Sequence, residues 1–144
     1  MKTPPSWILA ACASAFFAGL TAVFGKAAVA EIDPDMATLL RTVVILLLTA
    51  GVVACRGAWS RPAALSGRGA LFIVLSGVAT GLSWLFYYRA LRSGPASRVA
   101  PVDKLSVVFA MALAAAFLGE TVSWRAAAGG ALIVAGAVLI ASGA

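Results

Sequence analysis

Long apolar runs alternate with short polar connections along the chain. Crossing a bilayer with an α-helix takes about 20 consecutive, mainly apolar residues. The connections leave no stretch long enough for a soluble domain or a linker. The pattern therefore predicts an all-α integral membrane protein in which residues 1–144 form one bundle of five transmembrane helices. The expected helices cover residues of about 7–30, 36–55, 70–91, 99–118 and 124–143.

Composition supports this class and argues against several others. Hydrophobic residues make up 62% of the 144 positions and charged residues 11%, far from the mixture of a soluble domain. A net charge of +6 would suggest nucleic acid in a soluble chain, but here Lys and Arg border the apolar runs, so we expect no nucleic-acid partner. The chain has no His, neither Cys12 nor Cys55 has a base nearby, and no carboxylates are paired for acid–base work. We therefore expect no enzyme, no metal site and no cofactor.

The basic residues also bear on orientation in the membrane. The longest connection, residues 56–69, carries three Arg and no acid, which is the strongest cytoplasmic signal present. With five crossings, it places the N-terminus inside. Residues 9–12 resemble the cleavage site of a bacterial lipoprotein, but the first apolar run continues past them, as we expect of a spanning helix and not of a cleaved leader. The whole count is nearly balanced, so the chain could insert in both orientations and pair antiparallel with itself. The inner set is Lys2, Arg56, Arg61, Arg68 and Arg125, and the outer set is Lys26, Arg89, Arg92 and Arg98.

The start of the second run combines a turn with a buried charge. The acidic connection at residues 31–35 reads as a turn, with Asp35 placed to cap the following helix. Arg41 follows about 9 Å below that surface. Two interpretations stay open, because an arginine at this depth can snorkel to the interface or pair with a carboxylate or an anionic substrate inside the bundle.

The third run has two neighbouring stripes at helical spacing. One is polar, and the other is small and aromatic. Gly77 and Gly81 suit close helix contact. The aromatic residues form either an ordinary interfacial belt or part of a binding site. The polar stripe is Ser76, Thr80, Ser83 and Tyr87, and the second stripe is Gly77, Gly81, Trp84 and Tyr88.

The fourth run places an acid and a base inside the expected membrane helix. Pro101 is expected in or near its first turn, where a missing N–H is tolerated. Asp103 and Lys104 follow at the depth of Arg41 and the aromatic residues, which predicts either one binding layer or a salt bridge between Asp103 and Arg41. Asp103 is also the only acid well inside a span. In the last run, Gly129, Gly136 and Gly143 recur every seven residues, which favours helix packing within the chain or across an oligomer interface.

Several local sequences resemble the EamA domain, the repeat unit of the drug/metabolite transporter superfamily. They are residues 88–94 (YRALRSG) before a Ser/Ala-rich turn, residues 117–120 (FLGE) before a glycine-rich last helix, and residues 102–108 (VDKLSVV), which look like the half-size, five-helix form. Most members of that family fuse two such units with opposite orientation and carry amino acids, other metabolites or drugs, usually outward. The resemblance therefore implies that this single unit dimerises. This sequence departs from the family pattern in the fourth run. Members often have a proline near the position of Ser106 or Val107, whereas here Pro101 comes earlier.

The leading hypothesis is a secondary transporter in the bacterial cytoplasmic membrane, expected to export small metabolites, amino-acid-like solutes or drugs. Two copies, or this chain and a second half-size subunit, would enclose a cavity and alternate in access. Asp103 is the candidate for proton coupling. The alternatives are a structural or accessory membrane subunit and a lipid-headgroup flippase. The expected substrate-binding residues are Arg41, Thr80, Trp84, Tyr87, Tyr88, Asp103 and Lys104.

Overall fold

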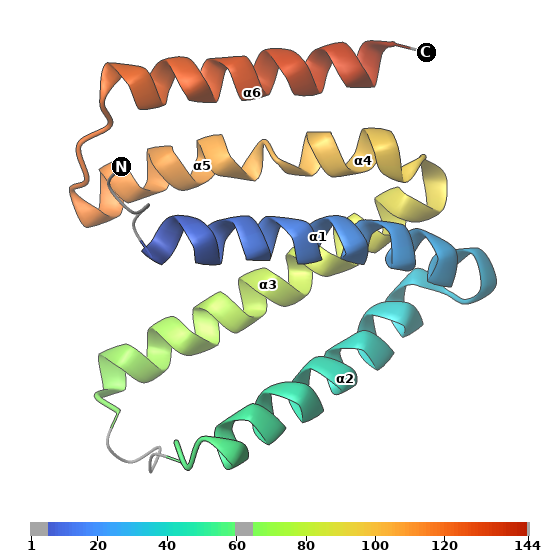
Figure 1. The fold of residues 1–144 in the computed structure, drawn as a ribbon, viewed down its shortest axis with the longest axis vertical. Helices are drawn as coiled ribbons and strands as arrows, with labels where there is room; N and C mark the ends of the chain where they lie inside the picture. Colours follow the sequence, from blue (N-terminus) through green and yellow to red (C-terminus); the bar gives the residue numbers. More distant parts are fainter. Residues whose placement is uncertain (1–5, 60–64, 144) are drawn as a thin grey trace. The chain divides into compact units, whose positions relative to one another are not determined.

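The protein is all-helical in the part of the chain that the computed structural model describes, residues 6–59 and 65–143 (Figure 1). Lys2 and Arg61, two of the expected inner charges, lie outside these residues. Five helical spans are long and apolar enough to cross a membrane, and most of their large apolar side chains are exposed, as lipid contact requires. This confirms the predicted multi-pass membrane protein.

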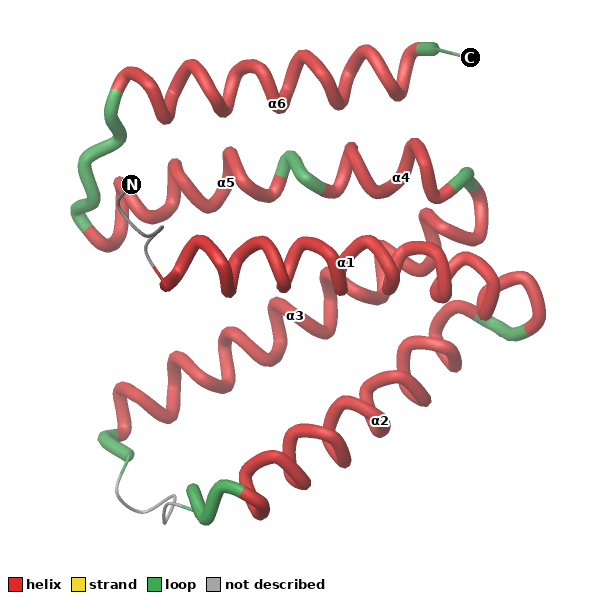
Figure 2. Tube along the Cα trace, viewed as in Figure 1, coloured by secondary structure: helices red, strands yellow, loops and turns green. Residues whose placement is uncertain are grey.

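The helices lie within a few residues of their expected bounds. Figure 2 shows that turns and short connections separate them. The fourth span, Ala96–Leu118, is the exception to regular helix because it contains three successive pieces. The elements are α1 (Ser6–Glu31), α2 (Pro34–Cys55), α3 (Gly67–Ser93), α4 (Ala96–Asp103), α5 (Ser106–Leu113), the π-helical turn η2 (Ala114–Leu118) and α6 (Trp124–Ser142).

The chain divides into two compact units, which are described separately below. Unit 1 is Met1–Lys26 with Ser93–Ala144, and unit 2 is Ala27–Arg92. Unit 2 therefore holds α2 and α3, and unit 1 holds the whole broken span and α6.

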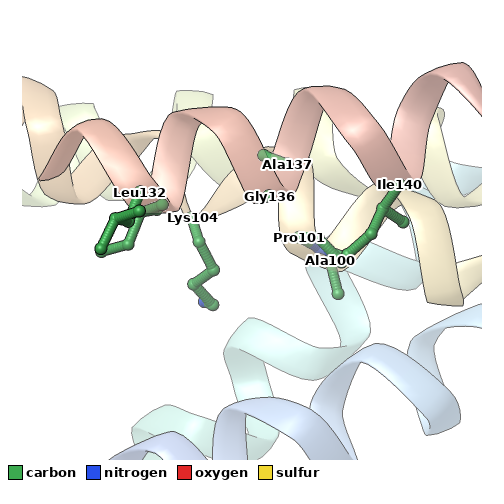
Figure 3. A pocket seen from close by; sticks show the side chains of 8 residues that line it. Ala100, Pro101, Lys104, Leu132, Gly136, Ala137 and Ile140 are labelled. Carbon is green, nitrogen blue, oxygen red and sulfur yellow. The ribbon is translucent and has the colours of Figure 1, made fainter. Parts of the chain in front are cut away.

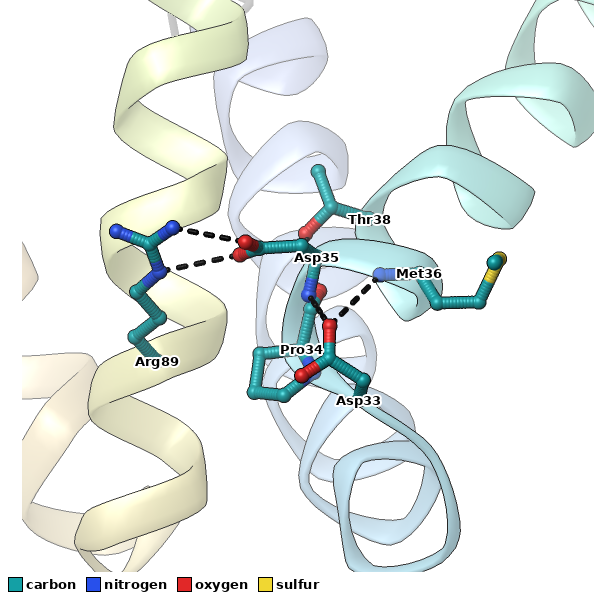
Figure 4. A network of polar contacts seen from close by, with 6 residues as sticks. All are labelled: Asp33, Pro34, Asp35, Met36, Thr38 and Arg89. Carbon is teal, nitrogen blue, oxygen red and sulfur yellow. Dashed lines mark hydrogen bonds and ion pairs between the residues drawn. The ribbon is translucent and has the colours of Figure 1, made fainter.

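The cap of α2 is Asp33 and not Asp35, so that prediction was wrong. Asp33 has an extended backbone directly before Pro34, and its Oδ1 accepts hydrogen bonds from the backbone N–H of Asp35 at 2.9 Å and of Met36 at 3.3 Å (Figure 4). This geometry satisfies donors that a helix start leaves without a partner. Asp35 sits in the first turn instead, which frees its carboxylate for another helix.

The fourth span breaks at Lys104 and Leu105, where an unbroken helix was expected. The N–H of Lys104 donates to the Pro101 carbonyl at 3.1 Å, and the N–H of Leu105 donates to Val102 at 3.0 Å. These are bonds across three residues, typical of a tightened turn. Because α4 begins at Ala96, Pro101 lies in its interior and not in its first turn, and a proline there removes a backbone bond and crowds the preceding turn.

The same span ends in a second irregular turn. The N–H of Glu120 donates to the Ala114 carbonyl at 3.3 Å, and Gly119 adopts φ 69°. That left-handed backbone favours glycine, because a side chain there would meet the following carbonyl. After the connection, Ser123 caps α6 by accepting from the N–H of Ala126 at 3.2 Å.

In unit 1, α6 packs against α4 and α5 through a face one residue away from the expected stripe. Gly130 and Ala137 are buried, and a Cβ on Gly130 would lie 2.6 Å from the terminal methyl of Met111. A Cβ on Gly129 or Gly136 would meet nothing within 4 Å. Among the described residues the same holds for Gly77 and Gly81 in unit 2, so the packing role of all four glycines stays a prediction. Gly143 instead accepts, through its carbonyl, a hydrogen bond of 2.8 Å from Nη2 of Arg98.

Candidate functional site

The centre of unit 2 is an arginine stacked on an aromatic ring. α2 carries Arg41, and α3 carries Trp84 and Tyr88. The guanidinium carbon of Arg41 lies 3.3 Å from the Trp84 ring centroid and 5.3 Å from that of Tyr88. A planar cation at this distance from an indole face makes a cation–π contact, the stronger for being shielded from water. This contact joins α2 to α3.

The ring under Arg41 is held by its neighbours. Trp84, Tyr87 and Tyr88 meet because residues three and four apart share a helix face. The Trp84 ring centroid lies 5.4 Å from that of Tyr87 and 5.9 Å from that of Tyr88, both edge-to-face. Tyr88 is only 3% exposed. The cluster is therefore a fixed platform, and edge-to-face contacts of its rings leave the Trp84 face to the guanidinium.

One N–H donor of Arg41, at Nε, makes no hydrogen bond with the described residues. Its Nε is buried and has no partner among the described residues. A buried donor left without a partner costs about 1–3 kcal/mol and more when it is charged. The structure thus adds a cation–π contact to the two interpretations of Arg41. Its buried Nε–H is a donor that a ligand oxygen could satisfy, since Arg binds carboxylates through parallel N–H donors.

A bidentate ion pair lies near this platform. Arg89 Nε donates to Asp35 Oδ1 at 3.0 Å, and Arg89 Nη2 donates to Asp35 Oδ2 at 2.8 Å (Figure 4). Arg92 donates to the backbone carbonyl of Val29, where α1 approaches its end and carbonyls need partners. Sequence reasoning read both arginines only as topology charges. The sequence did contain a sign of the Asp35–Arg89 pair. Asp35 lies at the start of one expected helix and Arg89 near the end of the next, so both are expected at the same membrane surface.

Thr80 lies one turn before Trp84 on α3. Its hydroxyl donates to the Ser76 carbonyl at 2.8 Å and is exposed. The hydroxyl proton is thereby used within the helix, and the oxygen can still accept. Thr80 is thus suited to accept a hydrogen bond from a ligand and not to donate one.

Asp103 and Lys104 lie in unit 1, at the break between α4 and α5. The Lys104 ammonium lies 3.4 Å from Asp103 Oδ2. The bridge from Asp103 to Arg41 stays a prediction. Among the described residues no three His, Cys, Asp or Glu side chains gather into a group that could hold a metal ion.

An open groove lies beside Lys104, between α4 and α6 in unit 1 (Figure 3). Its volume is about 410 Å³, and Lys104 is its one charged residue. Figure 3 shows the Lys104 side chain extending away from α6, so the ammonium lies at the edge of the groove. The lining residues are Ala100, Pro101, Lys104, Leu132, Ile133, Gly136, Ala137 and Ile140.

The described residues combine five apolar spans, an arginine stacked on an aromatic ring and a helix broken at charged residues. These are features of a membrane transport protein. The chain belongs to the EamA-like transporter family, whose model matches residues 5–142. It is 53% identical over 136 residues to an uncharacterized transporter in the cobO 3′ region of Sinorhizobium sp, a match that covers 94% of this chain and 96% of the relative. No solved structure matches the chain. The family resemblance seen in the sequence is confirmed, and a transporter role is supported over an enzymatic one.

Proposed function

We propose that the protein is a secondary transporter that exports small amphipathic solutes bearing a carboxylate across the bacterial inner membrane. The observation that carries the proposal is the Arg41 guanidinium, stacked on Trp84 with a buried N–H that lacks a partner. A solute carboxylate would bind the free edge of Arg41, and its apolar part would contact Tyr87 and Tyr88. Thr80 would accept a hydrogen bond from a polar group such as an amine.

The proposed transporter is a dimer that alternates between inward-open and outward-open states. A family unit of five helices and a nearly balanced charge count support two copies inserted in opposite orientations, since inverted repeats are common in transporters. The cavity would then be shared, with Arg41, Asp103 and Lys104 of each copy supplying its charge. Gly77, Gly81, Gly129 and Gly136 would form helix contacts between copies, and their open Cβ positions are compatible with that role.

Asp103 is the proposed coupling residue for protons. It is the acid well inside a span, and it ends the broken helix α4 next to Lys104. Protonation would remove its attraction for Lys104 and change the charge of the cavity. In everted vesicles, an uncoupler should abolish transport by the wild type. Asp103→Asn transport that still depends on the proton gradient would exclude this role.

The carboxylate site is tested in everted inner-membrane vesicles, where an exporter accumulates solute. The probes are radiolabelled phenylalanine, glutamate and benzoate, with tetraphenylphosphonium as a cationic comparison. We expect uptake of an amphipathic carboxylate by the wild type, and a loss of about tenfold or more for Arg41→Gln, because a charge-assisted contact is removed. Arg68→Gln is the matched control, since Arg68 also lies over a ring, that of Phe72 at 5.7 Å.

Three outcomes would contradict the proposal. Equal loss in both arginine variants would mean that overall charge matters and not the Trp84 platform. Uptake of tetraphenylphosphonium alone would exclude a carboxylate substrate. If the purified chain transports nothing until a second half-size protein is added, the accessory-subunit function would replace the proposal.

A further inference from the structure

The ion pair at the helix break has few partners within unit 1, as far as the described residues extend. Lys104 and Asp103 make one contact at 3.4 Å, and their side chains are 53% and 35% exposed. The Arg89–Asp35 pair, by contrast, has two contacts of 3.0 and 2.8 Å between residues of separate helices. Neighbours in a helical backbone point in directions about 100° apart, so Asp103 and Lys104 cannot align as closely.

The depth of the pair makes this costly. Asp103 is the eighth residue of α4, about 10 Å along the helix from Ala96 and well inside the span Ala96–Leu118. Ionised side chains within a membrane span almost always face the protein interior or a cavity and are paired there. A single loose contact leaves most donors of the ammonium and most acceptor sites of the carboxylate for another partner.

We propose that this partner is a second copy of the chain, so that Asp103 of each copy binds Lys104 of the other. This inference rests on the dimer in the proposed function and names its central contact. In a two-fold interface, if residue i of one copy contacts residue j of the other, then residue j of the first copy also contacts residue i of the second. A two-fold axis near the break would therefore bring two acids and two bases together in one neutral ring. The adjacent residues Asp103 and Lys104 are self-complementary in this sense.

The groove beside Lys104 supports a protein partner over lipid. It is apolar apart from Lys104, and Gly136 leaves one position of the α6 wall without a side chain. An acyl chain could fill the apolar part but would offer nothing to the exposed ion pair. The same surface of a second copy supplies both apolar side chains and the opposite charges.

The decisive test is complementation between two differently tagged copies. Asp103→Lys gives two positive charges at the break, and Lys104→Asp gives two negative charges. We expect each variant alone to lose dimer affinity by about tenfold or more, through repulsion across the axis. Co-expressed, the two variants should form a mixed dimer, measured by pulling down one tag and detecting the other. The result that would overturn the proposal is self-association of each variant at the wild-type level, or no mixed dimer.

Cross-linking keeps the proposal falsifiable if a charge variant does not fold. In chains with Cys12 and Cys55 replaced by Ser, one copy carries Asp103→Cys and the other carries Lys104→Cys. A short bifunctional thiol reagent should join the two tags in membranes. Copies solubilised separately and then mixed serve as the control for chance encounters. Absence of a link above that control would contradict the proposal.

The competing arrangement is a bridge from Asp103 to Arg41 within one chain. If that arrangement is correct, a single copy carrying Asp103→Cys and Arg41→Cys should be cross-linked within the monomer, and no cross-link should form between copies. Wild-type transport measured in parallel separates the two levels of inference. A chain that transports and dimerises but shows no mixed dimer would retain the proposed function and lose the reciprocal pair.

Discussion

The guanidinium of Arg41 lies flat enough over the indole of Trp84 to bring its central carbon within 3.3 Å of the ring centroid. This one contact decides which side of the arginine remains for a ligand. The ring covers one face of the guanidinium plane, and the N–H donors at its edge stay in the plane. A carboxylate that satisfies the buried Nε–H would therefore have to enter in this plane and not from the side that the ring covers.

The stack predicts that Trp84 sets the position of Arg41. Trp84→Ala should weaken binding of the carboxylate probe, while Trp84→Phe should weaken it less, because a phenyl ring retains a smaller cation–π attraction. Tryptophan fluorescence cannot report this change cleanly in a chain with four Trp residues. Binding is better measured by scintillation proximity with the radiolabelled probe that the wild type transports. Trp124→Phe, at the start of α6, is the control.

The Asp35–Arg89 pair predicts a stability effect that depends on pairing. Asp35→Asn and Arg89→Gln should each lower the midpoint of thermal unfolding in detergent, and the double variant should lose little beyond either single one. High salt should shrink the difference, because about half of each side chain is exposed. Additive losses from the two single variants would show that the residues act separately.

The buried face of α6 predicts a contrast between two adjacent glycines. Gly130→Leu should destabilise the protein by about 1–3 kcal/mol through overpacking, since even a Cβ there meets Met111. Gly129→Leu should have little effect on a single copy. Gly130→Ala should be mild, because the Met111 methyl is the flexible end of a side chain. Unfolding in detergent with increasing SDS measures all three. A larger loss for Gly129→Leu would mean that the expected glycine stripe is the packed face.

The helix break predicts a local change in hydrogen exchange. Pro101→Ala restores an N–H and removes the ring from the interior of α4, so the backbone amides of Lys104 and Leu105 should become more protected. Val107 and Val108 serve as internal references in α5. Unchanged exchange at Lys104 and Leu105 would show that the Asp-Lys pair, and not Pro101, keeps the helix open.

Much of the fold follows from the sequence because membrane helices leave a simple signal. Apolar length alone locates the spans, and the connections are too short to permit other structure. The depth count also brought Arg41 and Trp84 to one level, and the structure places them in contact. Helical spacing also placed Trp84 beside Tyr87 and Tyr88, and the structure shows these rings in contact.

The packed faces were harder to predict. The sequence favoured the stripe of Gly129, Gly136 and Gly143, but in a helix that is apolar on all sides no polar face shows which side meets protein, and the buried face contains Gly130 instead. Asp35 was expected to cap α2 because it directly precedes the expected start of that helix, and only the extended backbone of Asp33 before Pro34 shows where the helix begins. The break at Lys104 depended on where α4 begins, because a proline is harmless in a first turn and disruptive in an interior one.

One unbroken helix, α6, runs beside two shorter ones that meet at Leu105. The α4 piece is tied to it by a directional bond from Arg98 to the Gly143 carbonyl, whereas the α5 piece meets it at Gly130, where Met111 fills the space that a side chain would occupy. The two pieces of the broken span are therefore held to one helix by different means, a polar contact on one side of the break and close apolar packing on the other.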